Sequence, residues 1–107
     1  MDKREKALIE AKANILKALG HPTRLCMAEK LAAGEQCVCE LAEGIDADFS
    51  TISKHLSVLK QAGVVVDDKR GKQVYYSLKV PSLMQFMPCV EAVLEATAQT
   101  HIELIKE

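Results

Sequence analysis

The sequence predicts a mainly α-helical protein with a small β-hairpin wing, a winged helix-turn-helix that acts as a homodimer. Apolar residues recur at helical spacing through most of the 107-residue chain, a short helix precedes a Ser/Thr-rich helix, and a basic hairpin pattern follows. This length suits one domain, which we place over residues 1–107. With no Trp, two Phe and two Tyr, the core must be aliphatic.

The first half of the chain shows three helical segments. Residues 3–19 carry apolar side chains near the helical period, and a Gly-His-Pro turn ends this segment. Pro22 suits the first turn of a second helix over residues 22–33, which Gly34 ends. A short third helix is predicted over residues 38–43, and a turn over residues 44–47 leads to the next helix.

The fourth helix, residues 49–62, is the predicted DNA-reading helix. Asp48 or Ser50 can cap its start, and Gly63 follows its end. One stripe of this helix is apolar: Phe49, Ile52, Leu56 and Leu59. In a helix-turn-helix protein the second helix enters the major groove, where polar side chains contact bases and phosphates. We expect those contacts from the residues largely off the stripe: Ser50, Thr51, Ser53, Lys54, His55 and Ser57.

A hairpin with a basic turn follows this helix. Residues 64–66 and 73–78 have strand composition, and the polar turn between them, residues 69–72, contains a glycine. We expect Arg70 and Lys72 at the tip to contact an adjacent phosphate run or minor groove. The net charge of the chain is only −1, but residues 49–79 carry six Lys and Arg residues against two Asp. Positive charge is therefore concentrated in the module that would face phosphates.

The first and last helices are predicted to form the dimer. Pro81 and Pro88 precede a last helix over residues 88–106. Both terminal helices carry an apolar stripe that no further segment covers, and a second copy of the chain would cover it. A two-fold symmetric protein binds palindromic double-stranded operator DNA. No membrane contact is expected, because no stretch is long and apolar enough to cross a bilayer.

Two of the four cysteines, Cys37 and Cys39, are separated by a single valine. Because the charged N-terminus has no apolar run behind it, we expect a cytoplasmic protein in which cysteines stay as thiols. Metal or redox roles then outrank structural disulfides. Two thiols at a helix start can bind one soft ion together. The alternative is that both are small apolar side chains packed in the core.

Three segments together resemble the ArsR/SmtB family of winged-helix metal-sensing repressors. They are residues 18–25 (ALGHPTRL), 37–42 (CVCELA) and 50–59 (STISKHLSVL), and residues 63–65 and 71–78 also fit. The resemblance covers nearly the whole chain. It implies a homodimer that binds its operator, represses transcription there, and dissociates from the DNA when its ligand binds. No enzymatic activity is expected, since we find no nucleophile with a base and an orienting group.

In the arsenic-responsive branch of this family, a Cys-x-Cys element at the third helix binds arsenite or antimonite. The resemblance therefore implies As(III) or Sb(III) as inducer, held by Cys37 and Cys39. A third sulfur would complete a pyramidal site, but Ala42 stands where one branch has its third cysteine. Cys89, at the start of the last helix and facing the other subunit, is the preferred third ligand. Cys26, which its helical neighbours suggest is buried, is a less favoured third ligand, and water or another thiol is a further option.

The spacing of the two thiols suggests a mechanism. On a regular helix, residues i and i+2 point about 200° apart, so one ion could hold Cys37 and Cys39 only by unwinding the helix start. We expect the third helix to pack on the DNA-reading helix. Ligand binding would then tilt the DNA-reading face and lower the affinity for the operator.

Other sensor types match the sequence less well. The cadmium/lead branch has cysteines in its N-terminal arm, and residues 1–10 contain none. The zinc/nickel/cobalt branch uses an Asp-x-His and His-x-x-Glu set on the last helix, where this chain has only His101, which we assign to the interface or surface. His21 is assigned to a structural turn. A thiol-based redox or persulfide sensor on the same scaffold is the alternative, using Cys89 with Cys26 or with the Cys-x-Cys pair.

Overall fold

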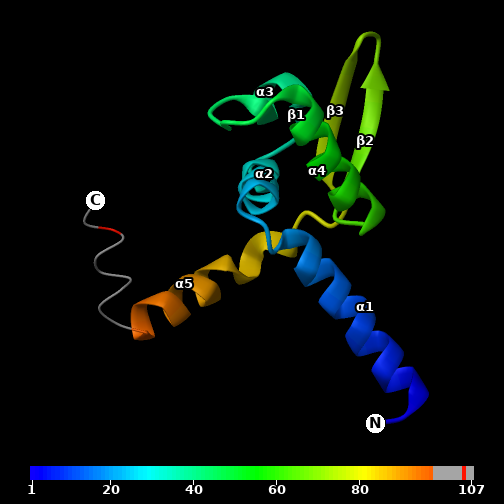
Figure 1. Cartoon of the computed structure of the whole chain (residues 1–107), viewed down its shortest axis with the longest axis vertical. Helices are drawn as coiled ribbons and strands as arrows, with labels where there is room; N and C mark the ends of the chain where they lie inside the picture. The colour runs from blue at the N-terminus through cyan, green and yellow to red at the C-terminus, as the bar shows by residue number, and fades with distance from the viewer. Residues whose placement is uncertain (98–104, 106–107) are drawn as a thin grey trace.

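The computed structural model describes residues 1–97 and 105. Within that range it contains a short strand β1 (Gln36–Cys37), a hairpin, and a 3-10 helix η1 (Leu83–Phe86). The hairpin strands are β2 (Val65–Arg70) and β3 (Gln73–Leu78). The α-helices of the described range are α1 (Lys3–Leu19), α2 (Pro22–Ala32), α3 (Val38–Ala42), α4 (Phe49–Gln61) and α5 (Met87–Ala96). Figure 1 shows α2, α3, α4 and the sheet forming one body, the predicted winged helix-turn-helix, from which α1 and α5 diverge.

The wing has three strands where two were predicted. Its antiparallel order is β1-β3-β2, and β1 places Cys37 opposite Tyr75. A two-residue strand has no periodicity of its own, so the sequence pattern could not reveal it. The strand β2 also runs on to Arg70, because it pairs with β3 along its full length, and the turn shrinks to two residues. Gly71 in that turn has a φ of 62°, a conformation that favours glycine.

The helices begin where the capping chemistry predicts. Of the two candidate caps of α4, Asp48 is used: its Oδ1 accepts a 2.7 Å hydrogen bond from the Thr51 amide. That hydrogen bond lowers the pKa of the Asp48 carboxyl. His21 caps α2 through Nδ1, which accepts from the Thr23 amide at 3.1 Å, so its predicted structural role in the turn is confirmed.

The core lies where α2, α3, α4 and the hairpin meet. Its largest fully buried side chains are aliphatic: Met27, Leu41, Ile52, Leu56, Leu59, Val64 and Val65. Phe49, expected in the same stripe, is 69% exposed. The prediction was wrong there because Phe49 occupies the first turn of α4 and lines an open hollow instead of the core.

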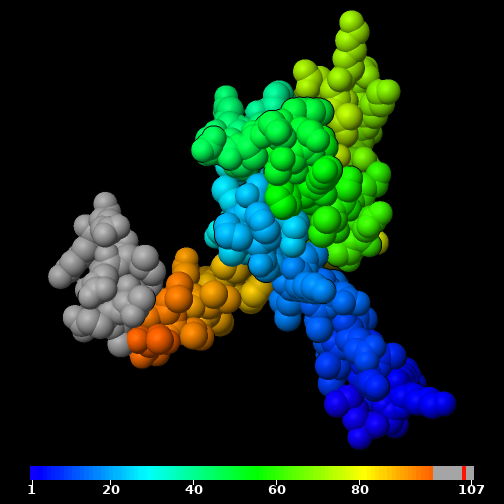
Figure 2. Space-filling view, viewed as in Figure 1, coloured from blue at the N-terminus to red at the C-terminus, as the bar shows by residue number. Residues whose placement is uncertain are grey.

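Helices α1 and α5 extend from the body as two arms (Figures 1 and 2). Both arms expose large apolar side chains: Leu8, Ile9 and Leu16 on α1, and Val93 and Leu94 on α5. A hollow of about 160 Å³, lined mainly by apolar side chains, opens where the arms meet. The predicted last helix over residues 88–106 is described only up to Ala96, and His101 lies outside the described residues. Among the helices described, none has the length and apolar character needed to cross a bilayer.

Candidate DNA interface and cysteine site

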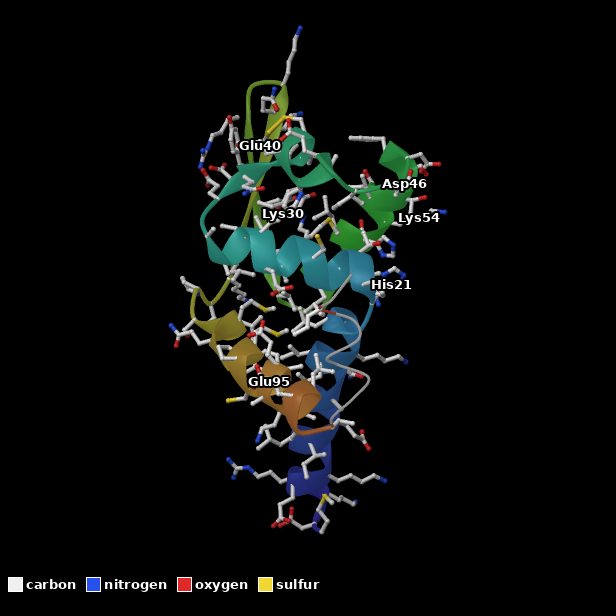
Figure 3. The ribbon with its side chains drawn as sticks, turned by 90° about the vertical axis from the view of Figure 1, so that its left-hand side faces the viewer. His21, Lys30, Glu40, Asp46, Lys54 and Glu95 are labelled. Carbon is white, nitrogen blue, oxygen red and sulfur yellow. A yellow bond between two sulfur atoms is a disulfide. The ribbon has the colours of Figure 1, made fainter. Side chains whose placement is uncertain are left out.

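One face of α4 presents the predicted DNA-contacting side chains. Ser50, Thr51, Lys54 and Ser57 are exposed, and Ser53 is half-buried. Residues 50, 54 and 57 follow the helical spacing that places side chains on one face. Lys54 extends outward from α4 (Figure 3), and within the described part of the chain it forms no ion pair. This surface matches what major-groove contact requires.

His55, also predicted to read DNA, is half-buried against the turn between α1 and α2. Its ring lies 4.4 Å from that of His21, centroid to centroid, and its Nδ1 lies 3.1 Å from Arg24 Nη1. Arginine can only donate, so His55 accepts through Nδ1. Burial, then His21, then Arg24 lower the pKa of His55. The neutral imidazole thus helps to fix α4 to the preceding turn.

This contact predicts an acid-sensitive fold. Because the pKa of His55 is below its ordinary value of 6.5 in the fold, the unfolded chain binds the proton more tightly. The stability that the contact contributes is therefore complete above pH 6.5 and is lost as the pH falls below it. We expect the melting temperature to fall between pH 7 and pH 5.5, and to fall by less in His55→Gln. If thermal denaturation gave the same dependence of melting temperature on pH for the wild type and His55→Gln, this prediction would be contradicted.

The two basic residues at the wing tip differ in their surroundings. Lys72 is exposed in the turn and forms no ion pair with any described residue. Arg70 instead donates two 2.7 Å hydrogen bonds to the Glu35 carboxylate and one of 2.9 Å to Asp68. Its guanidinium also lies 4.5 Å from the centroid of the Tyr75 ring. The carboxylates of Glu35 and Asp68 raise the pKa of Arg70 and compete with phosphate for it.

Removing the charge of Glu35 should strengthen DNA binding. Glu35→Gln leaves Arg70 with one carboxylate partner and makes its guanidinium available to phosphate. We expect a severalfold higher affinity, and a slope of log K against log salt that is steeper by about 0.9, the value of one added phosphate contact. Glu43→Gln, an equal charge change on an exposed residue away from Arg70, is the control. If both variants shift the slope equally, only net charge is acting.

The Cys37 and Cys39 side chains meet at the start of α3, where the structure joins their sulfurs in a disulfide (Figure 3, beside Glu40). Two expectations were wrong. The cysteines do not both rest as thiols, and no unwinding is needed to bring the sulfurs together. Cys37 is not inside the helix: its backbone is extended, with φ −76° and ψ 165°, and it is the N-cap. Its sulfur therefore folds back over the first turn, toward Cys39.

Both ends of α3 are fixed by side chains. The Cys37 amide donates to Glu40 Oε1 at 2.9 Å, and the Glu40 amide donates to Cys37 Sγ at 3.4 Å, a reciprocal capping box. At the other end Lys30 Nζ donates to the carbonyls of Leu41 and Glu43. Figure 3 shows Lys30 and Glu40 on their helices. A helix of five residues is thereby held in place, although it is too short to be stable in isolation.

The expected packing of α3 on α4 is less extensive than its packing on the wing. The principal contacts of α3 are with β1 and β3, so the cysteine pair is joined to the wing more directly than to the DNA-reading helix. Cys37 belongs to β1 and pairs with Tyr75 of β3, while Cys39 Sγ lies 4.0 Å from Gln73 Oε1. The neighbour of Tyr75 across the sheet is Asp68, a partner of Arg70.

The other two cysteines lie elsewhere. Cys89 is exposed on α5, and Figure 1 places α5 away from α3 within the subunit. It could complete a site at Cys37 and Cys39 only from a partner subunit. Cys26 is exposed on α2, not buried as predicted, because the buried side chains of that helix are Met27, Ala28 and Leu31. In the described ranges, no cluster of three or more His, Cys, Asp or Glu side chains is suited to hold a metal ion.

Sequence reasoning did not find four of the residues that position this site: Arg24, Lys30, Glu35 and Tyr75. The side-chain partners of Arg24, Lys30 and Glu35 lie between 11 and 35 residues away along the chain, and Tyr75 pairs with the distant Cys37 in the sheet. Charge or aromatic character alone does not reveal these pairs. The role of Glu40 could have been found, since a cap followed three residues later by glutamate is a helix-start signal. The cap here is cysteine rather than serine, which concealed the pattern.

Comparison with known proteins identifies the family. Residues 21–66 match the model of the bacterial regulatory protein, arsR family. The chain is also 36% identical over 90 residues to the arsenic resistance transcriptional regulator ArsR1 of Pseudomonas putida, a match that covers 83% of this chain and 67% of that protein. The chain belongs to the ArsR family. Its members are DNA-binding regulators and not enzymes, as the sequence predicted.

Another relative is named for a different metal. The cadmium resistance transcriptional regulatory protein CadC homolog of Staphylococcus aureus is 45% identical over 67 residues, covering 62% of this chain and 55% of that protein. Among solved structures, the homodimeric winged helix-turn-helix domain Mb0332 of Mycobacterium bovis superposes with a TM-score of 0.75 at 28% identity. That match covers 89% of this chain and 88% of the other. The family is thus established, whereas the inducer must be argued from the site.

Proposed function

We propose that this ArsR-family chain is a cytoplasmic transcriptional repressor that binds operator DNA as a homodimer and releases it when As(III) or Sb(III) binds Cys37 and Cys39. One observation carries the proposal: the two sulfurs already meet at the start of α3, so one thiophilic ion can bind both without unwinding that helix. The arsenic-regulator name of the Pseudomonas putida relative supports the same inducer.

The arms support the homodimer. Their exposed apolar side chains and the hollow between them offer surface that a second copy would bury. Two-fold pairing would present two α4 helices to successive major grooves of a palindromic site. The partner's α5 would then also determine whether the partner's Cys89 approaches the cysteine pair as a third ligand.

Binding of arsenite at this site balances without any change in arsenic oxidation state. The disulfide is first reduced by two molecules of a monothiol, which supply two electrons and two protons and become one disulfide. Arsenous acid then exchanges two As–O bonds for two As–S bonds to Cys37 and Cys39, and the two thiol protons leave as water with the displaced hydroxides. The soft thiolate–arsenic bond makes this exchange favourable.

The signal would reach DNA through the wing. Cys37 caps α3 and also pairs with Tyr75 in the sheet, so an arsenic atom inserted between the two sulfurs displaces the β1 edge. β3 carries that displacement to the turn that holds Lys72 and to the network around Arg70. We therefore replace the tilt of α4 with a movement of the wing as the step that lowers DNA affinity.

Operator release tests the proposal. Fluorescence anisotropy of the reduced protein on a labelled palindromic fragment of its own promoter should show binding that arsenite reverses. The expected stoichiometry is one As(III) per cysteine pair, read from sulfur-to-arsenic absorbance. Operator binding that resists saturating arsenite and antimonite would overturn the inducer assignment.

A second candidate function, thiol-based redox sensing, is favoured by the disulfide itself. Here the bond between Cys37 and Cys39, rather than arsenic, would change DNA affinity. Peroxide titration with no arsenic present distinguishes the two. Operator release accompanied by the loss of two hydrogens in the protein mass supports redox sensing, and unchanged binding excludes it.

A further inference from the structure

A hollow of about 260 Å³ opens beside the cysteine pair, between α3, the first turn of α4 and the wing. Cys39 is part of its wall, and the rest of the wall is mainly apolar: Val38, Ala42, Phe49 and Val74. Lys72 and Gln73 supply its polar side. Apart from Lys72, none of the predicted DNA-contacting residues lines this hollow, and neither Cys37 nor Glu40, which cap α3, is part of its wall.

The size and lining of the hollow fit a small aromatic group. An apolar cavity of about 150 Å³ holds benzene, so the space here accommodates a phenyl ring with room to spare. Phe49 is 69% exposed and offers a ring face or edge against which an aromatic ligand can pack. Phe49 does not contribute to the core, and its place in the wall of this hollow suggests a role in ligand binding instead.

The cysteine pair lies at the edge of the hollow. Cys37 is only 5% exposed, whereas Cys39 is exposed and lines the wall. An atom bound to both sulfurs therefore lies at the edge of the hollow, where its third substituent has room to extend along the apolar wall. Two sulfurs and one carbon complete the three-coordinate shell of a trivalent arsenical that carries a single organic group.

We propose that this site takes trivalent organoarsenicals with an aromatic substituent, the arsenic held by Cys37 and Cys39 and the ring held in the hollow. The inference rests on the proposed function and specifies its ligand class. After reduction of the disulfide by a thiol, R–As(OH)₂ exchanges two As–O bonds for two As–S bonds. Two waters leave, and the As–C bond and the oxidation state of arsenic are unchanged.

The test compares phenylarsonous acid, formed from phenylarsine oxide in water, with methylarsonous acid. Each is titrated into the reduced protein in the presence of dithiothreitol, which competes with the protein for the arsenical. Because dithiothreitol forms the same two As–S bonds with either compound, the comparison isolates the contribution of the organic group. Burial of the ring should give the phenyl compound a preference of about tenfold over the methyl compound. No preference in the wild-type protein would overturn the inference.

Two variants test whether the hollow causes the preference. Ala42→Leu fills the hollow, and Phe49→Ala removes its aromatic wall without touching the core, so it is informative even if Ala42→Leu folds poorly. Both should lose most of the phenyl preference while the methyl affinity stays within about twofold. Ala32→Leu adds the same volume on the exposed side of α2 and should keep the preference. Retention of the preference in both hollow variants, or its loss in the control, would overturn the inference.

The outcomes separate this inference from the proposed function. If arsenite releases the operator but the phenyl preference is missing, only the organoarsenical assignment fails. If the reduced protein takes up neither organoarsenical, with or without dithiothreitol present, or if Cys37→Ser and Cys39→Ser bind both as tightly as the wild type, the cysteine site and the proposed function fail together.

Discussion

Replacing either Cys37 or Cys39 with serine is expected to raise the arsenite concentration needed for operator release by at least about a hundredfold. Two sulfurs on one frame act as a chelate, and loss of one removes an effective concentration advantage of about 10² to 10⁴. The fold should tolerate the change. Serine is a preferred N-cap, so Ser at position 37 can still accept the Glu40 amide hydrogen bond.

The measurement is operator release by anisotropy, with thermal denaturation to verify folding. Cys26→Ser is the matched control, because Cys26 is exposed on α2 and should leave the response unchanged. Cys89→Ser determines the number of sulfur ligands: an unchanged midpoint indicates a two-sulfur site, and a higher midpoint indicates a third ligand from the partner. A normal response in both Cys37→Ser and Cys39→Ser would move the inducer site elsewhere.

Leu41→Ala is expected to lower the free energy of unfolding by about 2–5 kcal/mol, the usual range for removing a buried leucine side chain. Leu41 is fully buried, and it is the residue that fixes the five-residue helix α3 to the core. Without the Leu41 side chain, α3 should be held less firmly, and the two cysteines at its start should be positioned less precisely. DNA contact depends on α4, which packs on α2 and β2, and should suffer less.

Leu56→Ala provides the comparison, because it deletes the same atoms from a fully buried position in α4. Urea denaturation should show similar losses of stability for the two variants. Arsenite response at 15 °C, where both remain folded, should weaken mainly in Leu41→Ala, and DNA affinity mainly in Leu56→Ala. If both variants lost arsenite response and DNA affinity to the same extent, α3 would not position the cysteine pair independently of α4.

The helical parts of the fold could be predicted because their signals are local. Residues 3–19, the proline at the start of α2 and the aspartate before α4 each mark a helix through its own period or cap. The third strand could not be predicted, since Gln36 and Cys37 become a strand only by pairing with residues almost 40 positions later. Tertiary pairing, not composition, decides such a segment.

The same distinction applies to the candidate site. The exposure of Ser50, Thr51 and Lys54 follows from helical spacing, and the sequence sufficed for it. The engagement of Arg70 by Glu35 did not follow, because it joins residues 35 positions apart. The geometry of the cysteine pair was misjudged by a single position: treating Cys37 as helical instead of as a cap reversed the direction of its sulfur.

The unequal burial of the two cysteines sets an order of events. Under the proposed function, once the disulfide is reduced, an incoming arsenical would meet the exposed Cys39 first, and the covered Cys37 would then close the ring from within the protein. Capture is therefore a bimolecular collision followed by a fast unimolecular closure, and escape requires both bonds to break before either re-forms. A sensor of the proposed kind would respond to brief exposure to its inducer and recover slowly, so that recovery of repression would depend on new protein or on competing cellular dithiols.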